Sequence, residues 1–170
     1  PVGRGEVASL FLWATLALDL AMLGTAGSLA YHVAAQPDKR PETVGIVARS
    51  SIPMALAAVV IFGGFALAGG RIGSTPVAAL LLFALYSPLR IIFEELQALL
   101  QGDRRFRDFN AVRLIVALLP MVGFMAAAAV GRLSVITVAV IYAVSLTVSA
   151  GAALRAAAPL GIEARATQEL

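Results

Sequence analysis

The stretch TPVAALLLFALYSPLRIIFEELQALL, residues 75–100, decides the fold that this sequence predicts. As an α-helix it would be about 39 Å long, at a rise of about 1.5 Å per residue. A helix needs about 20 mostly apolar residues to cross roughly 30 Å of hydrocarbon, and it satisfies its own backbone polar groups in lipid. We therefore predict that this stretch crosses a membrane.

Four more apolar stretches lie on either side of it, separated by short polar links: Val7–Ala35, Val44–Ala68, Asn110–Val130 and Leu133–Ala157. Hydrophobic residues make up 60% of the chain and charged residues 14%, whereas soluble domains contain about 25% charged residues. The sequence thus predicts an all-α, polytopic transmembrane helix bundle with five spans. The bundle covers residues 1–158, and residues 159–170 form a cytoplasmic tail.

The first apolar stretch is predicted to be a retained span and not a signal peptide. It is too long for the apolar region of a signal peptide, and it has no clear cleavage site. It also follows Gly3-Arg4-Gly5-Glu6 instead of a basic segment. The first residues look like the end of a loop, so we expect the chain to be a fragment with one more span before Pro1.

The distribution of Lys and Arg predicts the orientation, because cytoplasmic loops are enriched in both. Nine of them lie on one side of the spans: Lys39, Arg40, Arg49, Arg104, Arg105, Arg107, Arg113, Arg155 and Arg165. Three lie on the other side: Arg4, Arg71 and Arg132. This bias places residues 36–43, 101–110 and the C-terminus in the cytoplasm, and residues 3–6, 69–74 and 131–132 outside.

Charged side chains at membrane depth indicate function, because each costs roughly 2.5–3.5 kcal/mol on insertion scales and has to face protein or water. Asp19 lies in the first span, and Arg90, Glu94 and Glu95 lie in the third. Arg90 and Glu94 share one helix face, so they can pair. The pair either neutralises itself near the cytoplasmic interface, or Arg90 lines a hydrated cavity and binds a phosphate. Asp19 is a hydrogen-bond partner between helices, a counter-ion of Arg90, or part of a transport pathway.

Small residues within the spans predict close helix packing, because they let backbones approach one another in a membrane. The residues of this kind are Gly24, Gly27, Ser28, Gly63, Gly64 and Gly123. Pro53, Pro88 and Pro120 also lie within spans, where each removes a backbone hydrogen bond.

Enzyme chemistry has no support in the sequence. The chain has no cysteine, and it lacks the HExxH, GxSxG and GxxxxGK[ST] patterns of zinc, serine and phosphate-loop sites. We expect no catalytic residue, no metal site and no cofactor. Nucleic acid is not an expected partner either, because Asp103 and Asp108 flank the basic run 104–107 and no soluble fold surrounds it. Anionic membrane lipids are the expected partners of the basic loops.

Two stretches resemble a known family. Gly3-Arg4-Gly5-Glu6-Val7-Ala8, followed by Leu12-Trp13 and Leu29-Ala30-Tyr31, resembles a loop and the second helix of bacterial oligosaccharide/polysaccharide flippases. These flippases belong to the multidrug/oligosaccharidyl-lipid/polysaccharide exporter superfamily. Residues 99–114, LLQGDRRFRDFNAVRL, are similar to the basic loop between helices four and five of that family. Together the two matches align this chain with helices two to six.

The resemblance implies most of the N-terminal lobe of a transporter with two six-helix lobes around a central cavity. Such a transporter moves polyprenyl-diphosphate-linked glycans across the bacterial inner membrane, and the remainder of the transporter supplies the first helix and the second lobe. Arg90 is then expected to bind the diphosphate, with Asp19 and Glu94 beside it, and to matter more for export than Arg71 in an external turn. Two alternatives stay open: a cation-coupled multidrug antiporter with Asp19 as its coupling site, and a non-transporting membrane scaffold subunit.

Overall fold

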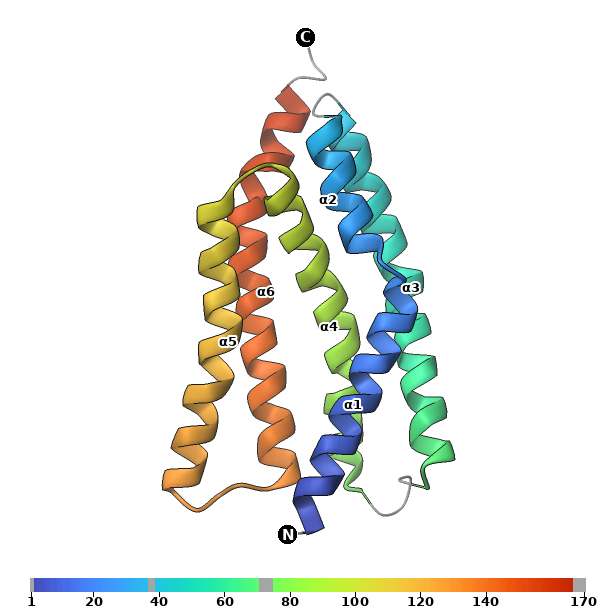
Figure 1. Cartoon of the computed structure of the whole chain (residues 1–170), viewed down its shortest axis with the longest axis vertical. Helices are drawn as coiled ribbons and strands as arrows, with labels where there is room; N and C mark the ends of the chain where they lie inside the picture. The colour runs from blue at the N-terminus through green and yellow to red at the C-terminus, as the bar shows by residue number, and fades with distance from the viewer. Residues whose placement is uncertain (1, 37–38, 71–74, 167–170) are drawn as a thin grey trace.

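The computed structural model describes residues 2–36, 39–70 and 75–166. Within these ranges the chain forms α-helices and no β-strand, which confirms the predicted all-α bundle. The helices are α1 (Val2–Met22), α2 (Thr25–Ala35), α3 (Arg40–Ala68), α4 (Val77–Gly102), α5 (Phe106–Ala129) and α6 (Val135–Ala166) (Figure 1). Five of them, α1 and α3 to α6, are long and apolar enough to cross a membrane. The chain is therefore a multi-pass membrane protein.

The helix ends differ from the predicted span ends for local reasons. Helix α3 begins at Arg40, and Pro41 occupies its first turn, where a missing backbone N–H costs nothing. Helix α5 begins at Phe106, with Asp108 in its first turn, where a carboxylate interacts favourably with the helix dipole. Helix α6 continues to Ala166, so residues 159–166 of the predicted tail are helical.

The first predicted span, Val7–Ala35, is two helices and not one. Helix α1 ends at Met22 and α2 begins at Thr25. Between them Leu23 and Gly24 have φ angles of 41° and 79°, a left-handed conformation that glycine adopts without steric cost. Gly24, predicted to be a packing residue, thus allows the helix to break.

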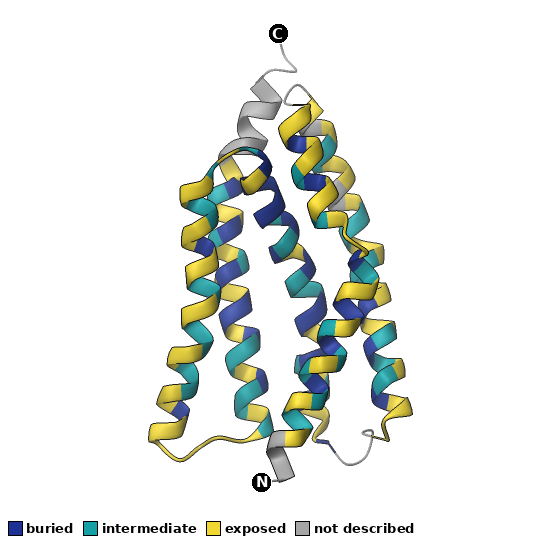
Figure 2. Ribbon diagram, in the orientation of Figure 1, coloured by how far each residue is buried: buried dark blue, intermediate teal, exposed yellow. Residues whose placement is uncertain are grey.

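Helix α4 is the centre of the bundle and contacts each of the other five helices. Figure 2 shows buried residues concentrated along it, whereas the outer helices carry long exposed stripes. Phe83, Ile91, Phe93 and Leu100 of α4 are almost fully buried. Apart from Leu146, the buried residues of α6 are small, which lets two helices approach closely: Ala139, Ala143, Ser145, Ser149, Ala153 and Ala157.

Close glycine contacts occur mostly at positions other than those predicted. A Cβ atom added at Gly102 would lie 2.7 Å from the backbone oxygen of Ala30, and one added at Gly69 would overlap the ring of Trp13. Gly123, a predicted packing position, is confirmed by its contact with Ile141. The remaining predicted glycines have open space within 4 Å of the added atom: Gly24, Gly27, Gly63 and Gly64.

The two ends of the bundle carry different loops. Helix α1 begins at the end of the bundle where α3 ends and where α5 connects to α6, and α6 ends where α3 begins and where α4 connects to α5 (Figure 1). The predicted cytoplasmic loops therefore share one end, and the predicted external loops share the other. Arg71 falls in residues 71–74, outside the described residues.

The orientation in the membrane is open to a direct test, because the chain has no cysteine to interfere with labelling. Asp103→Cys in the α4–α5 loop is expected to resist a membrane-impermeant thiol reagent in intact cells. Leu133→Cys, at an exposed position of the α5–α6 loop, is expected to react, because the excess of Arg and Lys lies at the opposite end. Labelling of Asp103→Cys but not Leu133→Cys would establish the reverse topology.

Candidate functional site

The predicted ion pair between Arg90 and Glu94 is present, near the midpoint of α4. Arg90 Nη2 contacts Glu94 Oε1, and each side chain is 28% exposed. The Arg90 guanidinium also lies 5.2 Å from the centre of the Phe93 ring. Arg90 lies about 18 Å along the helix from Gly102, which is too deep for an interfacial anchor. The pair therefore sits at the middle depth of the helix and is only partly covered by protein.

One cavity brings together the three residues that the sequence singled out. This Asp19 cavity has a volume of about 630 Å³ and lies where α1, the start of α2 and α4 meet. Its polar lining consists of Thr15, Asp19, Tyr86, Arg90 and Glu94, and Gly24 at the helix break also contributes. Among the described residues Asp19 forms no ion pair with Arg90. The cavity thus faces one guanidinium and two carboxylates.

A second cavity shares the Arg90–Glu94 pair and opens between α2, α4 and α5. This Arg113 cavity has a volume of about 360 Å³. Its polar lining is Arg90, Glu94, Gln97, Gln101 and Arg113. The Arg113 guanidinium lies 5.3 Å from the centre of the Phe109 ring, which also lines the cavity. Two guanidiniums and one carboxylate face this space, so its charge balance is opposite to that of the Asp19 cavity.

Three residues of these cavities were not predicted as site residues from the sequence: Gln97, Gln101 and Arg113. A signal for two of them is present, because Arg90, Glu94, Gln97 and Gln101 are spaced by four, three and four residues. Side chains at this spacing lie on one face of a helix. They form a polar stripe that runs from the middle of α4 to its last turn. Arg113 carries no comparable signal, because an arginine close to a basic loop is typical of membrane topology.

Glu95, the other acid in this part of α4, does not belong to either cavity. Its side chain is 5% exposed, and Ser51 Oγ of α3 donates a hydrogen bond to its Oε2. A buried carboxyl group requires such a partner, because an unsatisfied one is costly. Glu95 therefore connects α4 to α3.

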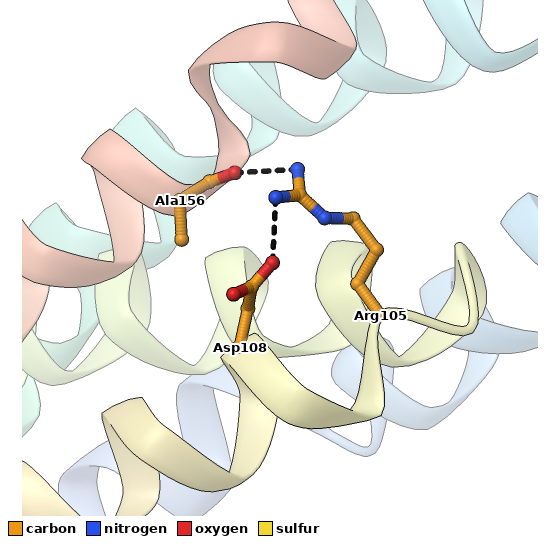
Figure 3. Close-up of polar contacts among 3 residues, drawn as sticks. All are labelled: Arg105, Asp108 and Ala156. Atoms are coloured by element: carbon orange, nitrogen blue, oxygen red, sulfur yellow. Dashed lines mark hydrogen bonds and ion pairs between the residues drawn. The ribbon is translucent and has the colours of Figure 1, made fainter.

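The basic loop between α4 and α5 is partly engaged in structure. Arg105 Nη1 donates a hydrogen bond of 2.7 Å to the backbone oxygen of Ala156 in α6, and Nη2 lies 2.5 Å from Asp108 Oδ2 (Figure 3). One guanidinium thus ties the loop and the start of α5 to α6. Arg104 in the loop and Arg107 in the first turn of α5 are exposed, so these two residues of the basic run fit the predicted contact with anionic lipids.

No protein-family model, curated protein or solved structure matches this chain. Within residues 2–36, 39–70 and 75–166, no group of three His, Asp or Glu side chains is placed to hold a metal ion. The structure thus has two cavities that share the Arg90–Glu94 pair, one with an excess of acidic side chains and one with an excess of basic side chains.

Proposed function

We propose that this chain is part of a transporter that flips lipid-linked oligosaccharide or polysaccharide precursors across the bacterial inner membrane. The observation that carries the proposal is the break between α1 and α2, which lies beside the Arg90–Glu94 pair in one cavity. Non-helical backbone at membrane depth is tolerated where it lines a cavity. Broken helices of this kind commonly form the binding sites of transporters.

The polar chemistry of the site supports a substrate with a charged head group. Ionisable residues within a membrane bundle typically mark a substrate or ion pathway. Arg90 offers a planar guanidinium that can bind two oxygens of a phosphate at once, and Glu94 neutralises it in the absence of substrate. The resemblance of residues 3–8 and 99–114 to oligosaccharide/polysaccharide flippases supports a polyprenyl diphosphate glycan as this substrate. The remainder of the transporter supplies the second lobe that alternating access requires.

A second candidate, a cation-coupled multidrug antiporter, is favoured by one observation. The Asp19 cavity faces two carboxylates and one guanidinium, and an excess of acid attracts a cation. Asp19 is the acid of this cavity that has no ion-pair partner within the described residues. It would then be the residue that exchanges a proton or a metal cation.

Asp19→Asn distinguishes the two candidates, because it removes the charge and keeps the shape of the side chain. For the flippase we expect cells that depend on the intact transporter to export lipid-linked glycan at close to the wild-type rate with this variant. For the antiporter we expect proton- or sodium-driven drug efflux to be lost. Accumulation of glycan on its lipid carrier in depleted cells, and its rescue by the wild-type protein, test the flippase proposal itself. If depletion changes neither glycan nor drug export, both transport candidates fail and the result favours a scaffold subunit.

A further inference from the structure

The two cavities differ in the ligand charge that they favour. The side chains that line the Arg113 cavity carry a net charge of +1, from Arg90 and Arg113 against Glu94. Those that line the Asp19 cavity carry a net charge of −1, from Asp19 and Glu94 against Arg90. Such a difference in net charge favours ligands of opposite charge. A phosphate placed beside Asp19 would meet repulsion. The same phosphate beside Arg113 would meet a second guanidinium.

The side-chain amide of Gln97 also points to a ligand in the Arg113 cavity. Its side chain is 6% exposed and lines the Arg113 cavity, yet its Nε2 atom is buried without a hydrogen-bond partner among the described residues. Native proteins rarely leave a buried donor unpaired, and such a group calls for an explanation. A glutamine amide carries two N–H donors. A ligand oxygen within reach of this amide would satisfy the unpaired donor.

The Arg113 guanidinium is available to bind a ligand. Arg113 is exposed and its guanidinium lies over the Phe109 ring, and a guanidinium in this position keeps its N–H groups free at the edge. Among the described residues, no acid forms an ion pair with it. Unlike Arg90, Arg113 therefore has its full capacity for a bidentate contact with an oxyanion.

The position of the cavity fits a ligand that enters from the cytoplasmic leaflet. Gln101 lies in the last turn of α4, at the end of the bundle where the basic loops gather. About 16 Å of helix separates Gln101 from Arg90. The polar stripe on α4 thus leads from the depth of lipid head groups toward the middle of the bundle, where the Asp19 cavity begins.

We propose that the Arg113 cavity is a phosphate oxyanion site in which Arg113 and Gln97 bind the head group of a lipid diphosphate before it reaches Arg90. That the ligand is a lipid diphosphate rests on the proposed function, whereas the oxyanion chemistry rests on the residues alone. Gln97 and Arg113 are then binding residues, and the unpaired amide of Gln97 is satisfied when the ligand is present.

The test is binding of farnesyl diphosphate, a short lipid diphosphate, to the intact protein in phosphatidylcholine nanodiscs. Arg113→Ala and Gln97→Leu are each expected to weaken binding about tenfold, the effect of one charge-assisted hydrogen bond. Arg107→Ala is the matched control, because Arg107 lies exposed in the same helix and outside the cavity. It is expected to bind as the wild type does. Gln97→Leu should also raise the melting temperature, since it removes a buried unpaired donor.

Wild-type binding by both Arg113→Ala and Gln97→Leu would overturn the proposal. If Gln97→Leu does not fold, Gln97→Glu replaces it, and its added charge should weaken binding more strongly. Inorganic pyrophosphate that competes as well as farnesyl diphosphate assigns the site to free phosphates, and displacement by phosphatidylglycerol in the nanodisc assigns it to membrane head groups. Either result supports an oxyanion site and overturns its lipid-diphosphate specificity. Glycan export is measured separately, so a failed flippase proposal leaves the binding result intact.

Discussion

Arg90→Ala is expected to lower export of a lipid-linked glycan roughly tenfold to hundredfold in the intact transporter. Arg90 lines both cavities near the midpoint of α4, and 28% of its side chain is exposed. A hydrogen bond to a charged group contributes about 1.5–3 kcal/mol, which corresponds to roughly that change in affinity. Arg90→Lys should recover only part of the loss, because lysine lacks the planar fork of donors. Export is measured as glycan that reaches the outer face of the membrane.

The control variants separate substrate binding from helix stability. Arg132→Ala removes an exposed arginine from the α5–α6 loop and should leave export unchanged. Arg90→Ala combined with Glu94→Ala removes the pair as a whole, so Glu94 is not left without its ion-pair partner. If the double variant inserts normally and exports glycan at the wild-type rate, Arg90 is only the partner of Glu94.

The membrane spans could be predicted from the sequence because length and hydrophobicity decide them. Residues 75–100 and 44–68 coincide closely with α4 and α3, since any apolar stretch of that length must form its own hydrogen bonds in lipid. The break after Met22 could not be predicted in this way. Leu23 and Gly24 are as apolar as their neighbours, and glycine is common in membrane helices without breaking them.

The charged residues of the candidate site within the spans could be predicted from the sequence. Asp19, Arg90 and Glu94 were found because charged residues are rare at membrane depth. Gln97 was missed because a neutral amide is less unusual there, and its importance depends on burial by neighbouring helices. Arg113 belongs to the site only because α5 packs beside α4 in the fold, a contact that single-helix patterns do not reveal.

Gly102→Ala is expected to destabilise the protein by about 1–3 kcal/mol, the usual cost of overpacking a tight contact. The added Cβ atom would lie 2.7 Å from the backbone oxygen of Ala30 and 2.7 Å from the Cβ atom of Val33. Neither atom can move without a shift of α2, because one belongs to the backbone and the other is fixed to it. The measurement is thermal unfolding of the purified protein in detergent, followed by loss of helical circular dichroism.

Gly64→Ala is the matched control, because the same atom added inside α3 meets nothing within 4 Å. It should be neutral or stabilise the helix by about 0.5–1 kcal/mol, since alanine loses less conformational freedom than glycine in a helix. An unchanged melting temperature for Gly102→Ala would mean that α2 and α4 are not in close contact. In that case the Arg113 cavity, which these two helices line together with α5, would have a different shape.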